Sequence, residues 1–121
     1  MKGIGVDAVD IDRFRRMLDR RPGMRSRLFT DGELRSLEGR RDDAPSLAAR
    51  FAVREAVMKA LGVGLGAFDF HDVEVQRADS GAPVLKITGR AHALAESRGV
   101  HAWHVSITHT DSTAMAVVAA L

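Results

Sequence analysis

The hydrophobic and polar positions at the start of the chain predict a strand followed by two helices. Residues 2–9 form a short apolar run that is typical of a buried strand, and Asp10 directly after it can cap a helix over residues 11–20. A Pro-Gly pair ends that helix. Thr30, with Glu33 three residues later, is a capping-box pattern and predicts the start of a second, short helix.

The strongest helical pattern lies in the middle of the chain, in the segment SLAARFAVREAVMKAL at residues 46–61. Its apolar residues recur at helical spacing, and Ser46, which follows a proline, is a favourable N-cap. Gly62 ends the pattern and begins the run GVGLG, which predicts a flexible loop.

The rest of the chain predicts four strands and one more helix. Alternating residues at 72–78 and 83–88 flank a turn sequence and predict a hairpin. A helical pattern covers residues 89–98, and strand patterns follow at 101–107 and 112–120. The predicted order β-α-α-α-β-β-α-β-β indicates an α+β fold, which we expect to form one domain over all 121 residues.

Composition excludes several classes of protein. With 121 residues, 45% of them hydrophobic, the chain can build one core. No apolar run approaches the roughly 18 residues of a membrane span, and acidic residues come too early at the N-terminus for a signal peptide. The absence of cysteine excludes a disulfide framework, a thiolate nucleophile and a cysteine zinc site. We therefore expect a cytoplasmic protein.

The net charge of +2 conceals a strong polarity along the chain. Of the 18 basic residues, 15 are arginine, and seven of these fall within residues 13–27 against a single acid. This basic segment therefore carries +6 and the other residues sum to −4. Such a concentration of arginine suits an acidic protein partner or a phosphate-rich one.

A few polar residues in the strand and the long helix point to chemistry. Asp7 lies inside an apolar strand, where a carboxylate is costly unless it pairs with an arginine, acts as a cap or binds a cation. Glu55 and Lys59 are one helical turn apart, as in an ordinary surface ion pair. Arg50 and Arg54 lie on the same helix and a glycine-rich loop follows, which also suits a phosphate site. Asp7 and Glu55 together would suit Mg²⁺, which prefers oxygen ligands.

His109 ends the run HVSITH and could bind phosphate or transfer a proton, although an exposed histidine in a turn is the alternative. The chain has no second histidine at metal-ligand spacing on a helix, which argues against zinc. It also has no nucleophile-elbow motif, which argues against a Ser-His-Asp hydrolase. The residues alone therefore indicate a small enzyme that uses Mg²⁺ and phosphate and carries a basic docking helix.

Three blocks together resemble the holo-[acyl-carrier-protein] synthases, the small bacterial 4′-phosphopantetheinyl transferases. The blocks are Gly3-Ile4-Gly5-Val6-Asp7 followed by Arg13, Arg50-Phe51-Ala52-Val53-Arg54-Glu55-Ala56 with Lys59-Ala60-Leu61-Gly62, and His104-Val105-Ser106-Ile107-Thr108-His109. A smaller match is Gly81-Ala82-Pro83. Because order, spacing and chain length all fit the family, the resemblance covers nearly the whole chain.

The resemblance implies a reaction and a set of roles. A serine hydroxyl of apo acyl carrier protein attacks the β-phosphate of coenzyme A, phosphopantetheine moves to the serine, and adenosine 3′,5′-bisphosphate leaves. By the same resemblance Asp7 and Glu55 hold Mg²⁺, and Lys59 contacts phosphate while Glu55 pre-positions it. Coenzyme A contacts are expected from Arg50, Lys59, Gly62, Pro83 and His109. The general base stays open between Glu55, His109 and a metal-bound water, and Thr110 stands where some relatives carry an acid.

The resemblance also implies partners. The family is usually a homotrimer with active sites between chains, so Asp7 and Glu55 of one chain are expected to meet the hairpin of the next. Its carrier proteins, from fatty-acid or polyketide synthesis, are acidic, and we expect Arg13, Arg20 and Arg27 to dock them. The alternatives are a nucleic-acid-binding module that uses the basic segment and a metal-dependent phosphohydrolase. Sparse aromatic residues and the lack of a second metal cluster weigh against them.

Overall fold

The computed structural model describes all residues from 1 to 121. Its helices are α1 (Ile11–Arg20), α2 (Met24–Leu28), α3 (Asp31–Ser36), α4 (Ala44–Leu61) and α5 (Gly89–Ser97), with a short 3₁₀ helix η1 (Phe70–Asp72). Its strands are β1 (Gly3–Asp10), β2 (Val73–Arg77), β3 (Pro83–Ile87), β4 (Trp103–His109) and β5 (Thr113–Ala120).

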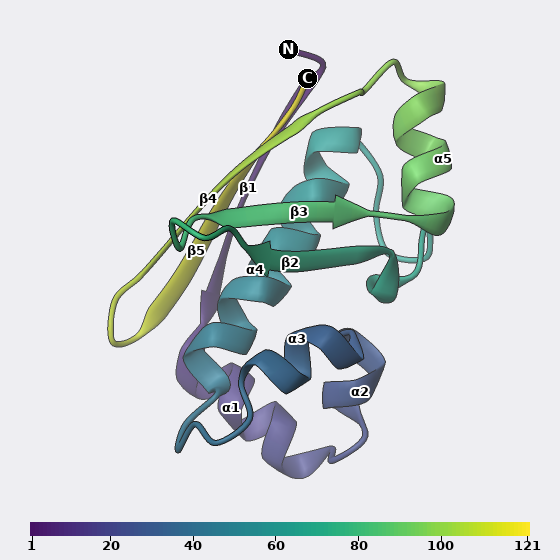
Figure 1. Cartoon of the computed structure of the whole chain (residues 1–121). Helices are drawn as coiled ribbons and strands as arrows, with labels where there is room; N and C mark the ends of the chain where they lie inside the picture. The colour runs from purple at the N-terminus through teal and green to yellow at the C-terminus, as the bar shows by residue number, and fades with distance from the viewer.

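The strands form a three-stranded antiparallel sheet and a separate hairpin. The sheet has the order β1-β5-β4, so β5 is central and the other two are edge strands. The hairpin β2–β3 crosses in front of α4, and α1, α2 and α3 gather at the N-terminal end of that helix (Figure 1). The long helix α4 contacts the sheet through β1, β5 and β4 and also contacts β2. It therefore lies between the sheet and the hairpin.

Two glycines allow β1 to lie directly against the backbone of α4. A Cβ atom built on Gly3 would stand 2.0 Å from the carbonyl oxygen of Ala60, and one on Gly5 would stand 1.9 Å from that of Ala56. No real side chain tolerates such contacts, so only glycine fits at these positions. Because side chains alternate along a strand, Asp7 follows on the same face and also points toward α4.

The core is built around both halves of α4. One cluster of 16 buried residues packs the C-terminal half of α4 against the sheet and the hairpin, and a second cluster of 10 packs the N-terminal half against α1 and its neighbours. Val9, Phe70 and Ile107 contact both clusters and join them. Most residues of α4 are buried, as expected for a helix surrounded on several sides. No helix is both long enough and apolar enough to cross a membrane.

The structure confirms the α+β class and most of the predicted elements. Asp10 caps α1 by accepting a hydrogen bond from the backbone N–H of Arg13 at 2.8 Å. Thr30 and Glu33 form the complete capping box at the start of α3. Gly62 ends α4 in the left-handed conformation, with a φ of 69°.

Some boundaries and two short elements differ from the prediction. Ser46 is not the N-cap, because α4 begins at Ala44 with Pro45 in its first turn, where the missing N–H of proline is harmless. The helix α2 and the 3₁₀ helix η1 were not predicted, since each is too short to show a periodic pattern. Strand β4 begins at Trp103, two residues later than expected, and ends at His109.

Candidate active site

The two carboxylates predicted to bind metal are brought together by the contact between β1 and α4. Asp7 is half-buried on β1, and Glu55 is half-buried on α4. Burial, and then the charge of Asp7, raise the pKa of Glu55, while the positive charge of Lys59 acts in the opposite direction. Two carboxylates that disfavour each other in this way are a place where a cation is favourable.

Lys59 has a different partner from the one expected. Its Nζ donates to Asp7 Oδ1 at 3.1 Å and to the backbone carbonyl of Val6 at 2.9 Å. Glu55 makes no such bond, so the predicted pairing of Lys59 with Glu55 is wrong. The glycines of β1 bring the strand close enough for Lys59 to reach it. Asp7 on the strand therefore takes the place of Glu55, one turn away on the helix, as the partner of Lys59.

Asp7 and Glu55 line a large open cavity of about 1040 Å³, here called the carboxylate cavity. Three arginines of the basic segment line it as well: Arg13, Arg21 and Arg27. The remaining wall is mainly apolar and includes Phe14, Met17, Met24, Leu28, Phe51, Phe68 and Phe70. The cavity therefore combines metal-binding oxygens, positive charge and an apolar surface.

The basic segment divides into arginines that hold the fold together and arginines that line the cavity. Arg15 pairs with Asp42 at 2.6 Å and also with Asp12, and Arg25 pairs with Asp43 at 3.0 Å. The bonds to these aspartates raise the pKa of both guanidinium groups. Arg13 and Arg27, two of the predicted docking residues, lie at the carboxylate cavity, whereas Arg20 is exposed outside it.

A second cavity, of about 270 Å³, gathers four basic side chains and is here called the arginine cavity. The basic residues are Arg40, Arg50, Arg77 and His109, and Ser46 and Pro83 also line it. They come from the loop before α4, from α4, from both hairpin strands and from the end of β4. Three of these lining residues, Arg50, Pro83 and His109, were predicted as coenzyme A contacts. Such a concentration of donors suits an anion.

Arg50 is the most constrained member of the arginine cavity. Its Nε is a buried atom without a hydrogen-bond partner, and the residue is only 6% exposed. Burial lowers its pKa most, Arg77, Arg40 and Arg54 repel it, and Glu33 counteracts them. A buried donor left without a partner is unfavourable, and the carboxylate oxygen of Glu33, 3.9 Å away, is too far to accept a hydrogen bond from this Nε.

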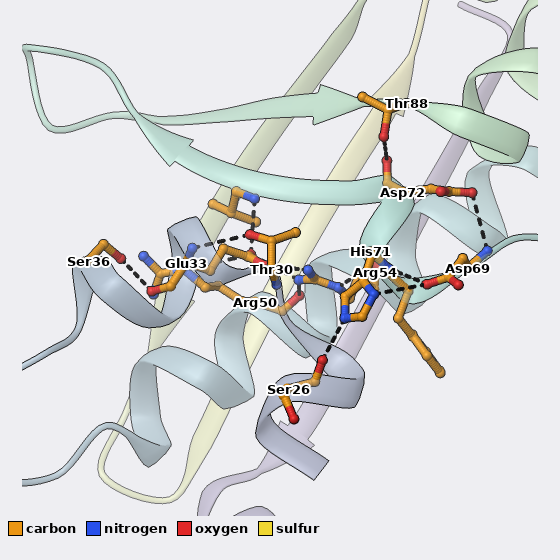
Figure 2. A network of polar contacts seen from close by, with 12 residues as sticks. Ser26, Thr30, Glu33, Ser36, Arg50, Arg54, Asp69, His71, Asp72 and Thr88 are labelled. Carbon is orange, nitrogen blue, oxygen red and sulfur yellow. Dashed lines mark hydrogen bonds and ion pairs between the residues drawn. The ribbon is translucent and has the colours of Figure 1, made fainter. Parts of the chain in front are cut away.

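Glu33 and Arg54 form a buried ion pair between the two cavities (Figure 2). Arg54 donates to both carboxylate oxygens of Glu33 and, at 3.0 Å, to the carbonyl of Phe70. Glu33 also accepts from the backbone N–H of Val75 at 3.1 Å and lies 3.9 Å from Arg50. The pair thus fixes α3, α4, η1 and β2 relative to one another, beside Phe70 of the carboxylate cavity and Arg50 of the arginine cavity.

Several of these residues were not identified from the sequence. Arg40 and Arg77 belong to no local motif, and only folding places them beside Arg50. Glu33 was recognised as part of a capping box, but that pattern gives no sign of its partner on α4. His71 lines the carboxylate cavity and contacts the carbonyl of Ser26 at 2.6 Å (Figure 2), which ties η1 to α2. Among these residues only Glu33 carried a sequence signal, namely its place in the capping box with Thr30.

The predicted site residues therefore fall into two groups on one chain. Asp7 and Glu55 line the carboxylate cavity beside edge strand β1, whereas Arg50, Pro83 and His109 line the arginine cavity beside edge strand β4. Neither cavity is lined by Lys59 or Gly62, which lie at the C-terminal end of α4.

The donor set suits a metal that shares its coordination with other molecules. No group of three or more histidine, aspartate or glutamate side chains is arranged to hold an ion. Asp7 and Glu55 could supply two oxygen ligands, and burial together with the charge of Asp7 raises the pKa of Glu55. Mg²⁺ commonly binds through one or two carboxylates and completes its shell with water and substrate phosphate. The residues present therefore fit Mg²⁺.

Comparison with known proteins identifies the family. Residues 3–118 match the 4′-phosphopantetheinyl transferase superfamily. A holo-[acyl-carrier-protein] synthase of Streptomyces avermitilis is 49% identical over 118 residues, which cover 98% of this chain and 95% of the relative.

Solved structures agree with the sequence match. A holo-[acyl-carrier-protein] synthase from Neisseria meningitidis superimposes with a TM-score of 0.91 at 28% identity, covering 100% of this chain and 98% of the other. The Helicobacter pylori holo-[acyl-carrier-protein] synthase, solved in complex with coenzyme A, gives a TM-score of 0.84 at 27% identity and covers 98% and 99%. With a match over nearly its whole length and the same fold, the chain belongs to the 4′-phosphopantetheinyl transferase superfamily.

Proposed function

We propose that the protein is a holo-[acyl-carrier-protein] synthase, which transfers 4′-phosphopantetheine from coenzyme A to a serine of apo acyl carrier protein and releases adenosine 3′,5′-bisphosphate. The observation that carries the proposal is the carboxylate pair Asp7 and Glu55 in a cavity edged by Arg13 and Arg27. The whole-length similarity to holo-[acyl-carrier-protein] synthases supports the same reaction.

Asp7 and Glu55 would hold Mg²⁺ in this proposal. When bound, the metal supplies positive charge that neutralises the diphosphate and helps to orient it for in-line attack. The two residues come from a strand and a helix that are in backbone contact, so their spacing is fixed by rigid elements.

The arginine cavity would take phosphate groups of coenzyme A. Arg50 and His109 would contact these phosphates, as the family resemblance implies, and Arg40 and Arg77, which line the same cavity, are further candidates. Their guanidinium groups can bind phosphate oxygens in pairs. Relatives solved in complex with coenzyme A, among them those from Helicobacter pylori and Bacillus anthracis, support coenzyme A as the substrate.

Two side chains remain candidates for the base that accepts the serine proton. Glu55 lies in the cavity where the carrier would enter, and its raised pKa makes its carboxylate a better proton acceptor. His109 lies in the other cavity, and its Nδ1 is 3.3 Å from the carbonyl of Thr110. It could accept the serine proton only in a site shared with Glu55 of a neighbouring chain.

A homotrimer with sites between chains would join the two cavities. The outer face of β1 and β5 exposes four large apolar side chains, Ile4, Val6, Met115 and Val117, which are 39–60% accessible. The register places Val6 opposite Val117, so these side chains form a continuous patch. Such a surface is typical of contacts between subunits. We propose that a second copy brings its arginine cavity to the carboxylate cavity of the first.

The carrier protein would dock on the arginines beside the carboxylate cavity. Arg13 and Arg27 lie next to Asp7 and Glu55, so a serine on an acidic helix would be guided toward the carboxylates. Arg20, exposed in the last turn of α1, would add a further positive charge for the carrier. The scarcity of aromatic residues for base stacking argues against a nucleic-acid partner and favours a protein. We place the reaction in the cytoplasm, as the sequence indicates.

The test is a transfer reaction with purified components. The protein is mixed with apo carrier protein, coenzyme A and Mg²⁺, and the carrier is weighed by mass spectrometry. We expect the carrier to gain the mass of one phosphopantetheine group while adenosine 3′,5′-bisphosphate appears in equal amount. The absence of any mass gain across carriers from fatty-acid and polyketide synthesis would refute the proposal.

A further inference from the structure

Lys59 makes the sole hydrogen bond to the Asp7 side chain in the structure. The lysine Nζ lies 3.1 Å from Asp7 Oδ1 and 2.9 Å from the carbonyl of Val6. Glu55, one turn earlier on the same helix, receives no hydrogen bond, and its pKa is raised. One carboxylate of the pair thus has an internal cation and the other has none.

The two partners in this contact differ in mobility. Asp7 belongs to a strand held by its register with β5, opposite Ala116, and its side chain is 18% exposed. Lys59 is 54% exposed and has a flexible four-carbon stem. Breaking the contact therefore moves the lysine and leaves the aspartate in place.

We propose that Lys59 is an internal counter-ion that competes with the divalent cation for Asp7. In the metal-free protein its ammonium group neutralises the aspartate. When Asp7 binds the cation, Lys59 leaves and becomes available to the diphosphate of coenzyme A. Lys59 is thus a positioning residue whose release follows metal binding. This inference rests on the proposed function for the identity of the metal and of the diphosphate.

Competition for Asp7 is testable without any reaction. Mn²⁺, which shares the preference of Mg²⁺ for oxygen ligands, is titrated into the coenzyme A-free protein, and free Mn²⁺ is followed by electron paramagnetic resonance. We expect Lys59→Met to lower the Kd for Mn²⁺ about five- to tenfold, because a positive charge beside the ligand is removed. Asp7→Asn should abolish the binding in both backgrounds.

Two further variants separate charge from structure. Lys59→Arg keeps a cation within reach of Asp7 and should stay within about twofold of the wild-type Kd. Lys2→Met makes the same chemical change five residues before Asp7 and should leave the Kd unchanged. Melting temperatures with and without Mn²⁺ provide a second readout, since Lys59→Met should gain more stability from the ion than the wild type does.

The outcomes distinguish this inference from the proposed function. Equal Kd values for wild type, Lys59→Met and Lys59→Arg would overturn the competition even if phosphopantetheine transfer occurs. The expected order of Kd values in a protein that transfers no phosphopantetheine would support the competition and refute the proposed function. Mn²⁺ binding that is unchanged in Asp7→Asn, or no binding to any variant, would overturn the competition. Either result would also overturn the assignment of Asp7 as a ligand of the cation.

Discussion

Glu55 is the residue at which stability and function oppose each other. Burial and the neighbouring Asp7 raise its pKa, so the folded protein binds this proton more tightly than the unfolded chain does. The stabilising contribution of the protonated group is complete below the ordinary glutamate pKa of 4.5 and is lost as pH rises through the higher folded-state value. At neutral pH the ionised Glu55 therefore destabilises the metal-free fold, while its charge is what a metal ligand requires.

We expect Glu55→Gln to stabilise the protein at pH 7 and to abolish its activity. Removing the charge should raise the unfolding free energy by about 0.5 kcal/mol, a value reduced for solvent screening. Phosphopantetheine transfer should fall by about 100-fold or more, because the proposed Mg²⁺ ligand is lost. Thermal unfolding and the carrier mass assay measure the two effects.

The pH dependence provides the control for this variant. Near pH 3 the glutamate is protonated, so wild type and Glu55→Gln should unfold at the same temperature. Glu38→Gln, at an exposed position of similar chemistry, should match the wild type at both pH values. Stabilisation by Glu55→Gln that persists at pH 3 would indicate a packing effect in place of a charge effect.

At the scale of elements, the contact between β1 and α4 positions the carboxylate pair. The strand lies on the helix backbone because Gly3 and Gly5 have no side chain. The same approach determines which strand atoms Lys59 reaches, namely Asp7 Oδ1 and the carbonyl of Val6. A change in the separation of strand and helix would therefore alter stability and the spacing of the proposed metal ligands together.

We expect Gly5→Ala to destabilise the protein by about 2–3 kcal/mol, in the range for overpacked cores. The new methyl group would meet the carbonyl oxygen of Ala56 at 1.9 Å, and a helix backbone atom cannot turn aside as a side chain can. Urea unfolding measures the loss. The matched control is Gly64→Ala, where an added Cβ meets nothing within 4 Å, and it should stay within about 0.5 kcal/mol of wild type. Equal stability of the two variants would contradict the role given to this contact.

At the scale of the whole molecule, one chain carries two separated halves of the proposed site. The carboxylate cavity lies beside β1 and the arginine cavity beside β4, on opposite edges of the sheet. A closed ring of identical chains can join unlike surfaces of neighbours at every interface. The proposed trimer would in this way turn two incomplete sites per chain into one complete site per interface.

We expect two inactive variants to restore activity when they are co-expressed in one assembly. Asp7→Asn inactivates the carboxylate cavity and Arg50→Met the arginine cavity, so each alone should transfer no phosphopantetheine. With random mixing, half of the carboxylate cavities and half of the arginine cavities remain intact, so about a quarter of the sites between chains should be active. The carrier mass assay on the purified mixture checks this.

If the complete site instead lies within one subunit, we expect the opposite result. In that case no mixture of the two variants contains a complete site, and activity should stay at the background of the separate variants. A mixture of Asp7→Asn with Glu55→Gln is the control, since both changes affect the same cavity and should not complement each other.

The amino-acid sequence alone determined the features that depend on near neighbours. Asp10 as the cap of α1, the Thr30–Glu33 capping box and the glycine end of α4 follow from residues three or four positions apart. The strand patterns and the α+β class follow from local periodicity in the same way. The family motifs marked Asp7 and Glu55 because they form continuous segments around each residue.

The tertiary structure alone decided which distant residues meet. The bond between Lys59 and Asp7 spans 52 positions, and the pair of Glu33 and Arg54 spans 21. Both contacts depend on how closely another element packs on α4. The glycines of β1 and the buried charges of Glu33 and Arg54 determine that packing, and local spacing does not. Spacing favoured Glu55 as the partner of Lys59 because a helix brings such residues near, but the strand offered a carboxylate and a carbonyl together. Long-range packing, which no short motif encodes, therefore set the partners and placed Asp7 and Glu55 in one cavity and Arg50, Pro83 and His109 in another.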